Sequence, residues 1–284
     1  NHLGRITGRY ALNLRNLREK GLFDSSWGAD WSPYARNPYA HHPPLRNVLD
    51  VAFGALPGEF PETPPDTGPR SDPRVYHSVC LFTEVIEEGG RLHGVVPFGD
   101  GRAARFPLAP FLGLMGVTAD TEESLNSVPP GRHGGNLDVN ELQVGSTLYL
   151  PVQVPGAGFY AGDPHYAQGD GEVALTALEA PLRATLRLSV IPQAEAAALL
   201  GALAEPFAET ATHWIPIGLH EDLDEAMRRA VRAAVDFLSR TQGMARAQAL
   251  AYLSAAADFE VSQVVDQVKG VHCLIRKADF AAWQ

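Results

Sequence analysis

One polar loop carries the residues with the clearest chemical potential. It reads Gly-Asp-Pro-His-Tyr-Ala-Gln-Gly-Asp-Gly-Glu over residues 162–172. Pro164 biases Asp163 toward an extended backbone, and in an extended chain side chains two residues apart point to the same side. Asp163 and His165 can therefore reach one metal ion, and a carboxylate beside an imidazole is ordinary zinc or iron ligation. The simpler alternative is a turn with a surface Asp163 and a packed His165.

A second polar loop precedes it and reads Pro-Pro-Gly-Arg-His-Gly-Gly-Asn-Leu-Asp over residues 129–138. Asn136 and Asp138 share one side if the chain is extended there. We predict Asp138 as a third metal ligand and Asn136 as a substrate-binding residue. Glycines on both sides of His133 let the backbone turn sharply, which makes His133 another substrate-binding candidate. Alternatively, Asn136 and Asp138 only form an Asx turn that caps the next strand.

The end of the first-named loop supplies a candidate for proton transfer. Glu172 directly precedes the apolar residues Val-Ala-Leu, where a carboxylate is costly unless it is paired. One carboxylate can activate a water as a base and then protonate a leaving group as an acid, so Glu172 is the predicted catalytic residue. Gln168 is predicted to bind substrate, or else backbone. Asp170, between two glycines, is a substrate-binding candidate or a turn residue that binds backbone.

These motifs, in this order, resemble the acetamidase/formamidase family of small-amide hydrolases. The resemblance extends over about residues 56–280 and includes Gly-Ser-Thr-Leu-Tyr-Leu-Pro-Val at 145–152 and Lys-Gly-Val-His at 269–272. It implies cleavage of the C–N bond of formamide-like or acetamide-like substrates to carboxylate and ammonia. The alternatives are hydrolysis of a cyclic amide such as a γ-lactam, and a non-catalytic ligand-binding protein on the same scaffold.

Ligand chemistry and the resemblance together favour a metal-assisted reaction. A divalent ion, with zinc as the first choice, would be held by Asp138, Asp163 and His165, and Glu172 would pass a proton to the departing ammonia. His213 and His272 lie among apolar residues. A histidine in such a position is more often a satisfied core residue than a ligand, so neither is assigned to the site.

The composition limits the class of partner. The chain has 33 acidic against 23 basic residues, a formal net charge of −10, whereas nucleic acids and anionic membranes require clustered positive charge. Its 2 cysteines are too few for a disulfide scaffold. We expect a cytoplasmic enzyme that acts on a small molecule, as a homo-oligomer. The chain begins with Asn1, and residues 1–55 match the family poorly, so an N-terminal fragment of the same precursor is a further candidate partner.

We predict an α+β, β-rich fold with a β-sandwich or barrel-like body and a smaller C-terminal α/β part, as the resemblance also implies. Three regions are expected. Residues 1–74 form a poorly matched N-terminal segment that ends in a proline-rich connection, residues 75–192 form the β-rich body with the site motifs, and residues 193–284 form the C-terminal α+β portion.

The expected elements follow from periodicity and turn signals. Strands at residues 75–86 and 91–97 flank the turn Glu-Glu-Gly-Gly. Further strands are predicted as buried at 144–154 and 172–179, and as half-buried at 183–191, where apolar and polar residues alternate. Two closing strands are expected around residues 259–265 and 271–275.

Three helices are expected, at residues 193–204, 222–240 and 246–256. The middle one has the clearest signal, because Asp222 can cap it while Glu225 reaches back to the capping residue. One apolar face at a spacing of 3.6 residues is predicted to pack inward; it consists of Leu223, Ala226, Met227, Ala230, Val231, Ala234, Val235 and Leu238.

Overall fold

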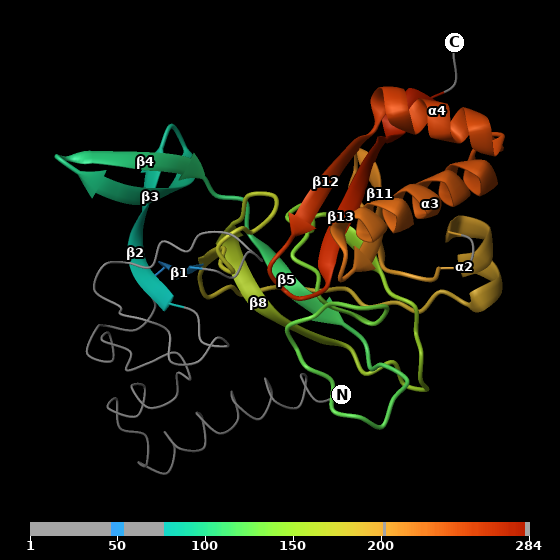
Figure 1. Cartoon of the computed structure of the whole chain (residues 1–284), viewed down its shortest axis with the longest axis horizontal. Coiled ribbons are helices and arrows are strands. Elements are labelled where there is room, and N and C mark those ends of the chain that lie inside the picture. The colour runs from blue at the N-terminus through green and yellow to red at the C-terminus, as the bar shows by residue number, and fades with distance from the viewer. Residues whose placement is uncertain (1–46, 54–76, 201–202, 282–284) are drawn as a thin grey trace.

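The structure is a computed structural model that describes residues 47–53, 77–200 and 203–281 (Figure 1). It is a β-rich α+β fold, as predicted. It has two antiparallel sheets and a layer of helices that covers one face of the smaller sheet. The proline-rich connection predicted within residues 1–74 lies outside the described residues. No helix in the described part of the chain has the length and apolar character needed to cross a bilayer.

The larger sheet has eight strands among the described residues, in the order β4-β3-β2-β1-β9-β8-β5-β6. These strands are β1 (Asn47–Phe53), β2 (His77–Glu88), β3 (Arg91–Gly99), β4 (Arg102–Pro107), β5 (Phe111–Gly116), β6 (Gly134–Asn136), β8 (Tyr160–Ala167) and β9 (Leu178–Glu179). The predicted hairpin between β2 and β3 is confirmed, and Gly89 and Gly90 turn the chain with φ of +60° and +75°. Figure 1 shows β2, β3 and β4 as an arm that projects from the rest of the molecule.

The smaller sheet has the order β12-β13-β11-β10-β7 in the described residues. Its strands are β7 (Thr147–Tyr149), β10 (Phe207–Glu209), β11 (His213–His220), β12 (Asp258–Gln263) and β13 (Lys269–Arg276). The two closing strands predicted near the C-terminus are therefore confirmed. Since β7 pairs with β10, this sheet spans the region boundary expected at residue 192, and that boundary stays a prediction.

Helices cover one face of the smaller sheet (Figure 1). They are α2 (Gln193–Leu200), α3 (Leu223–Thr241) and α4 (Arg246–Ala256), followed by the 3-10 helix η2 (Lys277–Phe280). Helix α3 packs on β11 and β13, and α4 packs against α3. The closest approach is at Gly218 of β11, where an added Cβ would lie 2.3 Å from both Ala226 O and Ala230 N. A glycine is required there because the helix backbone occupies the space of a side chain.

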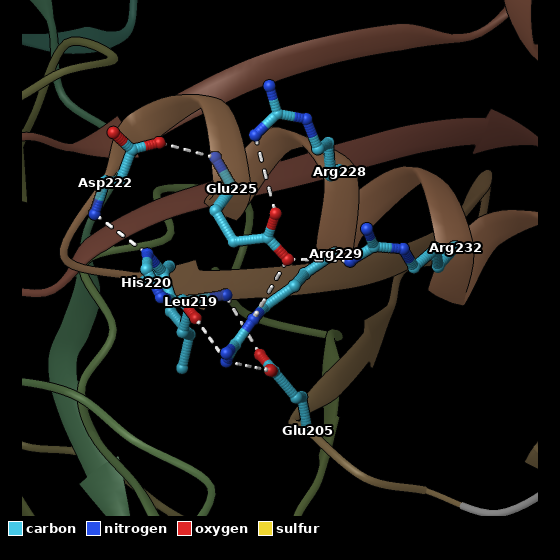
Figure 2. Close-up of polar contacts among 8 residues, drawn as sticks. All are labelled: Glu205, Leu219, His220, Asp222, Glu225, Arg228, Arg229 and Arg232. Atoms are coloured by element: carbon cyan, nitrogen blue, oxygen red, sulfur yellow. Dashed lines mark hydrogen bonds and ion pairs between the residues drawn. The ribbon is translucent and has the colours of Figure 1, made fainter.

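The start of α3 is capped as predicted, but by only one of the two expected contacts (Figure 2). The Asp222 carboxylate accepts the Glu225 backbone N–H at 2.8 Å. The predicted return contact from the Glu225 side chain is wrong, because the Asp222 backbone N–H donates to His220 Nδ1 at 2.9 Å. Glu225 instead accepts from Arg232 at 2.7 Å and Arg228 at 3.5 Å. The positive side chains three and seven residues along the helix draw the carboxylate away from the helix end.

A second polar contact holds α3 against the end of β11. Arg229 donates to Glu205 Oε1 at 3.0 Å and to the Leu219 carbonyl at 2.9 Å, while Glu205 Oε2 accepts the Leu219 N–H at 2.9 Å (Figure 2). Burial raises the pKa of Glu205, although its contacts with Leu219 and Arg229 oppose that rise. These bonds satisfy the polar groups where the strand leaves the sheet.

The buried face of α3 differs in part from the predicted one. Ala226, Ala230, Ala234, Val235 and Leu238 are buried as expected. Leu223, however, is 37% exposed, and Phe237, absent from the predicted face, is 4% exposed. The aromatic ring of Phe237 fits the smaller sheet's core between Phe207 and Trp214, so the buried stripe is wider at its C-terminal end.

Three predicted strands are wrong in extent or in burial. Of residues 144–154 only β7 pairs, and Val144 is fully exposed; of residues 172–179 only β9 pairs. Residues 183–191 form no strand and are almost entirely exposed. Alternation of apolar and polar residues gives a strand only where a partner strand accepts its hydrogen bonds, and none in the described part of the chain does so for this segment. Helix α2 also ends earlier than predicted.

The hydrophobic core has two main layers. The first lies between the sheets and combines Phe111 and Met115 of β5 with Ile215, Ile217 and Leu219 of β11. The second lies between the smaller sheet and the helices. Because side chains on a strand alternate between faces, the odd-numbered residues of β11 face the larger sheet while Trp214 and Gly218 face the helices. Sheet, sheet and helices are thus stacked in that order.

Candidate active site

Four neighbouring strands, β9-β8-β5-β6, bring the polar loops together. His165 lies in the C-terminal half of β8, where it is paired with Phe111 of β5 on one side and with Glu179 of β9 on the other. Its ring packs edge-on against Phe111 at a centroid distance of 5.0 Å. Asp138 follows β6, and Glu172 follows β8. The antiparallel register therefore gathers side chains that are distant in sequence around one imidazole.

The imidazole of His165 is surrounded by carboxylates. Its Nε2 lies 3.3 Å from Asp163 Oδ1 and 3.4 Å from Glu179 Oε1. Ligand atoms of Asp138, His165 and Glu172 all lie within 4.8 Å of one another, and the same holds for Asp163, His165 and Glu179. His165 and Asp138 are fully buried, whereas the side chains of Asp163 and Glu179 keep 33% and 29% exposure. Solvent reaches the cluster from the side of these two residues.

Gln168 fixes the orientation of the imidazole. Its Nε2 donates to the carbonyls of Asp138 and Ser262 at 2.8 and 3.2 Å. Because carbonyls only accept, the amide oxygen must face the other way, and it lies 3.0 Å from His165 Nδ1. His165 Nδ1–H therefore donates to Gln168, and Nε2 points toward Asp163 and Glu179. This favours the second of the two roles predicted for Gln168, that of a residue bound to backbone.

Gly113 of β5 leaves the space in which the cluster meets. An added Cβ would lie 2.3 Å from Asp138 Oδ1, 2.7 Å from His165 Cε1 and 3.1 Å from Asp163 Oδ2. The Gly113 carbonyl also accepts the backbone N–H groups of Leu137 and Asp138 at 3.0 and 3.1 Å. The glycine is needed because any side chain would fill the centre of the cluster.

The backbone at the cluster departs from the extended conformation expected from Pro164. Asp163 has φ of +53°, and Asp138 and Glu172 have +49° and +43°. The expectation that Asp163 is extended is therefore wrong, although its side chain still meets His165. A non-glycine residue in the left-handed region costs on the order of 1–3 kcal/mol and persists where the surrounding structure imposes it. Three such residues at one cluster favour a functional role.

Crowding of buried acids changes their titration. Burial, reinforced by the charge of Asp266, raises the pKa of Glu172 to about 9. Burial also raises the pKa of Glu179 to about 7 and that of Asp266 to about 6. Burial alone would lower the pKa of His165, but the contact with Asp163 outweighs it and raises that pKa to about 9. The buried acids of the cluster are therefore not all ionised together unless a proton or a cation neutralises part of their charge.

The residues present fit a divalent cation. Both carboxylate oxygens of Asp138 and Nε2 of His165 are buried without a hydrogen-bond partner. An unpartnered buried polar atom costs free energy, and a cation at this point would satisfy all three. Carboxylates and one imidazole are suitable ligands for zinc and related ions. The candidate ligands fall into two groups that share His165, one with Asp138 and Glu172 and the other with Asp163 and Glu179, so Glu179 is a further candidate beside the predicted Asp138, Asp163 and His165.

The remaining predicted residues divide between the cluster and other places. The Asn136 side chain donates to Asp266 Oδ2 at 3.1 Å and so stands at the edge of the cluster. His133 lies on the turn before β6, outside the groups that could hold a metal in the described residues, and burial lowers its pKa. Asp170 belongs to a different group, with Glu141, Glu260 and His272.

Sequence reasoning missed Glu179, Asp266 and Gly113. Glu179 ends an apolar run, and Asp266 follows the buried Val265. Like Glu172, both are carboxylates beside apolar residues, where an unpaired charge is costly. Nothing in the sequence distinguishes Gly113 from the other glycines, because its role depends on which strand lies opposite.

Comparisons with known proteins identify relatives of this chain. Two curated relatives are a formamidase of Methylophilus methylotrophus, 49% identical over 51 residues, and an acetamidase of Mycolicibacterium smegmatis, 40% identical over 57 residues. These segments cover 18% and 20% of this chain but only 12% and 14% of the relatives. The matched part is thus a small fraction of each relative.

Solved structures match over a longer stretch. An acetamidase from Bacillus halodurans has a TM-score of 0.60 at 27% identity, covering 83% of this chain and 70% of that one. An acetamidase from Yersinia enterocolitica has a TM-score of 0.62 at 25% identity, covering 84% of this chain and 66% of that one. Residues 108–276, which include the whole cluster, match the Acetamidase/Formamidase family. The chain belongs to the acetamidase/formamidase family.

Proposed function

We propose that this protein hydrolyses the C–N bond of a small aliphatic amide, such as formamide or acetamide, to a carboxylate and ammonia, with the assistance of a divalent metal ion. The observation that carries the proposal is the buried cluster around His165, with unpartnered ligand atoms and a neighbouring acid, Glu172. Relatives named formamidase and acetamidase support the substrate class.

The metal would be held by Asp138, Asp163 and His165, with Glu179 as an additional ligand. When bound, such an ion supplies Lewis-acid chemistry, since it lowers the pKa of water and polarises an amide carbonyl. Gln168 keeps the proton of His165 on Nδ1, so the lone pair of Nε2 remains directed into the cluster. Zinc is the proposed ion because the ligand set combines nitrogen and oxygen donors.

Glu172 is the proposed proton shuttle. As a carboxylate it takes a proton from the attacking water, and as a carboxylic acid it delivers that proton to the amide nitrogen while the C–N bond breaks. The raised pKa of Glu172, about 9, makes it a strong base once ionised. The positive charge of a divalent ion bound nearby would favour the ionised form of Glu172, which the first step requires. His133 and Asn136 stay predictions as substrate-binding residues.

A screen of amide turnover tests this function. The full polypeptide, loaded with Zn²⁺, is assayed for ammonia release with formamide, acetamide and propionamide, and for formation of the ring-opened amino acid with a γ-lactam. A Glu172→Gln variant serves as the control for contaminating amidases. Release from a linear amide that Glu172→Gln lacks supports the proposal. Ring opening of the lactam alone would favour the cyclic-amide alternative. Absence of turnover on every amide would favour a ligand-binding protein.

We further propose that the enzyme works in the cytoplasm as a homo-oligomer. The net charge of −10 and the presence of only 2 cysteines support an enzyme of small molecules in a reducing compartment. Size-exclusion chromatography with light scattering tests the oligomeric state, and a mass equal to one chain of 30.6 kDa would contradict it.

A further inference from the structure

A second group of potential ligands lies outside the proposed active site. It contains Glu141, Asp170, Glu260 and His272, whose ligand atoms all lie within 4.8 Å of one another. Glu260 of β12 and His272 of β13 are direct partners in the antiparallel register, so their side chains stand on the same face. Glu141 and Asp170 come from the turns that follow β6 and β8. Four segments of the chain therefore converge on one point.

His272 gives independent evidence that something is bound there. Its side chain is fully buried, and Nε2 points at the group, 3.0 Å from Glu141 Oε2 and 3.5 Å from Glu260 Oε2. By hydrogen-bond geometry, neither Nε2 nor Glu141 Oε2 has a partner in the described residues. Leaving such buried atoms without a bond is costly.

The other side of the imidazole is already anchored. His272 Nδ1 and the buried Ser262 Oγ are 2.8 Å apart. In metal sites the second ring nitrogen is usually held in this way, which orients the first nitrogen toward the ion. Asp170 is likewise held, since Asn140 Nδ2 donates to its Oδ1 at 3.1 Å.

The negative charge of this second group of ligands also favours a bound cation. Its three carboxylates against at most one imidazolium leave a net charge of −2 or below. In the described part of the chain, the ion pairs of these acids involve only His272, and no Lys or Arg lies within ion-pair distance of them. Ligands about 2.0–2.2 Å from a tetrahedral zinc lie roughly 3.3–3.6 Å apart. The separations from Nε2, 3.0 and 3.5 Å, are close to that spacing.

We infer that Glu141, Asp170, Glu260 and His272 form a second divalent-cation site, separate from the cluster around His165. One imidazole with three carboxylates suits an ion of the zinc or manganese class. The inference does not depend on amide turnover.

The position of the site indicates what the cation does. Glu260 and His272 belong to the smaller sheet, whereas Asp170 follows a strand of the larger one. The same junction contains the backbone bonds Gly171 N–H to Val261 O at 2.6 Å and Val264 N–H to Gly171 O at 3.1 Å. The cation therefore links the two sheets and fixes the loop of residues 168–172. Gln168, at the start of this loop, orients His165. Glu172, at its end, is the proposed proton shuttle.

Zinc binding to the full-length protein tests the site. Equilibrium dialysis against Zn²⁺ with elemental analysis is carried out on the wild type, on a Glu141→Gln/Glu260→Gln variant, and on Asp163→Asn, which weakens only the active-site cluster. The double variant should bind one equivalent less than the wild type, and Asp163→Asn should retain that equivalent. Equal zinc content in the wild type and the double variant would overturn the inference, whatever the active-site cluster binds.

A milder variant keeps the test valid if the double variant fails to fold. Asp170 is exposed, and Asp170→Asn preserves its shape while removing one ligand charge, so the dissociation constant of the second equivalent should rise by about tenfold or more. Asp224→Asn, on the exposed surface of α3, is the matched control and should bind as the wild type does. An unchanged dissociation constant in Asp170→Asn would also contradict the site. Loss of amidase activity with intact zinc stoichiometry would instead count against the proposed function.

Discussion

Three acids at the proposed active site have a left-handed backbone conformation that residues other than glycine rarely adopt. They are Asp138, Asp163 and Glu172. The fold holds two of them by backbone hydrogen bonds. Asp138 donates its N–H to the Gly113 carbonyl, and Glu172 donates its N–H to the Gly169 carbonyl at 3.2 Å. The left-handed backbone turns each carboxylate toward His165, which an extended chain would not do for all three. The strained backbone at these three positions thus accompanies the grouping of their carboxylates around His165.

Glu172→Gln separates the possible roles of this acid. Gln keeps the shape and length of the side chain but cannot transfer a proton, so turnover of the amide should fall by about two to four orders of magnitude. Bound metal and melting temperature should change little, because Glu172 lies beside the ligand atoms of Asp138 and His165 but is not one of the proposed ligands. A parallel loss of metal would make Glu172 a ligand, and near-normal turnover would remove it from the mechanism.

Gly113→Ala tests the space at the centre of the cluster. The new methyl would overlap Asp138 Oδ1 and His165 Cε1, so the variant should lose most of its active-site metal and be destabilised by about 1–3 kcal/mol. Gly162→Ala on β8 is the matched control, because its Cβ would meet only Leu114 at 3.9 Å. Metal content by elemental analysis and thermal melts compare the two. Full metal occupancy in Gly113→Ala would show that the ion is not bound there.

At the scale of elements, the helices and closing strands were predictable because each has its signal within its own residues. Helix α4 spans residues 246–256, as predicted, and α3 was placed by its cap and its 3.6-residue period. The strand predicted at residues 183–191 has an equally regular period of two but no partner strand in the described residues. A strand depends on hydrogen bonds to another segment, and the sequence of the segment itself does not contain that partner.

Gly218→Ala tests how closely α3 lies on β11. The added Cβ would stand 2.3 Å from two backbone atoms of the helix, so the helix must shift and the free energy of unfolding should fall by about 3 kcal/mol. For a chain of this size that corresponds to a melting temperature roughly 6–12 °C lower. Gly169→Ala, whose Cβ would meet nothing within 4 Å, should stay within about 0.5 kcal/mol of the wild type. Equal melting temperatures for both variants would contradict the packing.

At the scale of the whole molecule, the site exists only because the two sheets meet. Asp163, His165 and Glu172 lie close in sequence, and their grouping could be predicted from the motif. Glu179 and Asp266 reach the cluster from β9 and from the β12–β13 connection, and only the sheet order brings them there. The same is true of His272. The sequence indicated a satisfied core histidine, and the fold places its free nitrogen among acids from three other segments.

The crowded acids predict a particular pH dependence of stability. Glu172, Glu179 and Asp266 have pKa values of about 9, 7 and 6 in the folded protein, all above the ordinary values of 4.5 for Glu and 3.8 for Asp. A carboxyl with a raised pKa binds more protons when folded, so the free energy of unfolding falls as pH rises between the two values. His165, raised from 6.5 to about 9, acts in the same direction, because its stabilisation is complete below 6.5 and is lost toward 9.

Metal-free protein should therefore melt at a lower temperature at a pH of about 8 than at a pH of about 5. Added Zn²⁺ should reduce this difference, since the cation neutralises the ionised acids. Thermal melts of chelator-treated protein across that range, with and without Zn²⁺, provide the check. A melting temperature that rises with pH in the metal-free protein would show that the acids are not crowded as described.

The central claim is that a divalent ion bound by Asp138, Asp163 and His165 is required for amide hydrolysis. The most direct measurement is ammonia release from formamide and acetamide by chelator-treated protein while Zn²⁺ is titrated back and bound metal is counted. The account predicts that turnover disappears with the metal, returns in proportion to the metal bound, and does not return in Asp163→Asn. Full turnover by protein shown to contain no metal would contradict it.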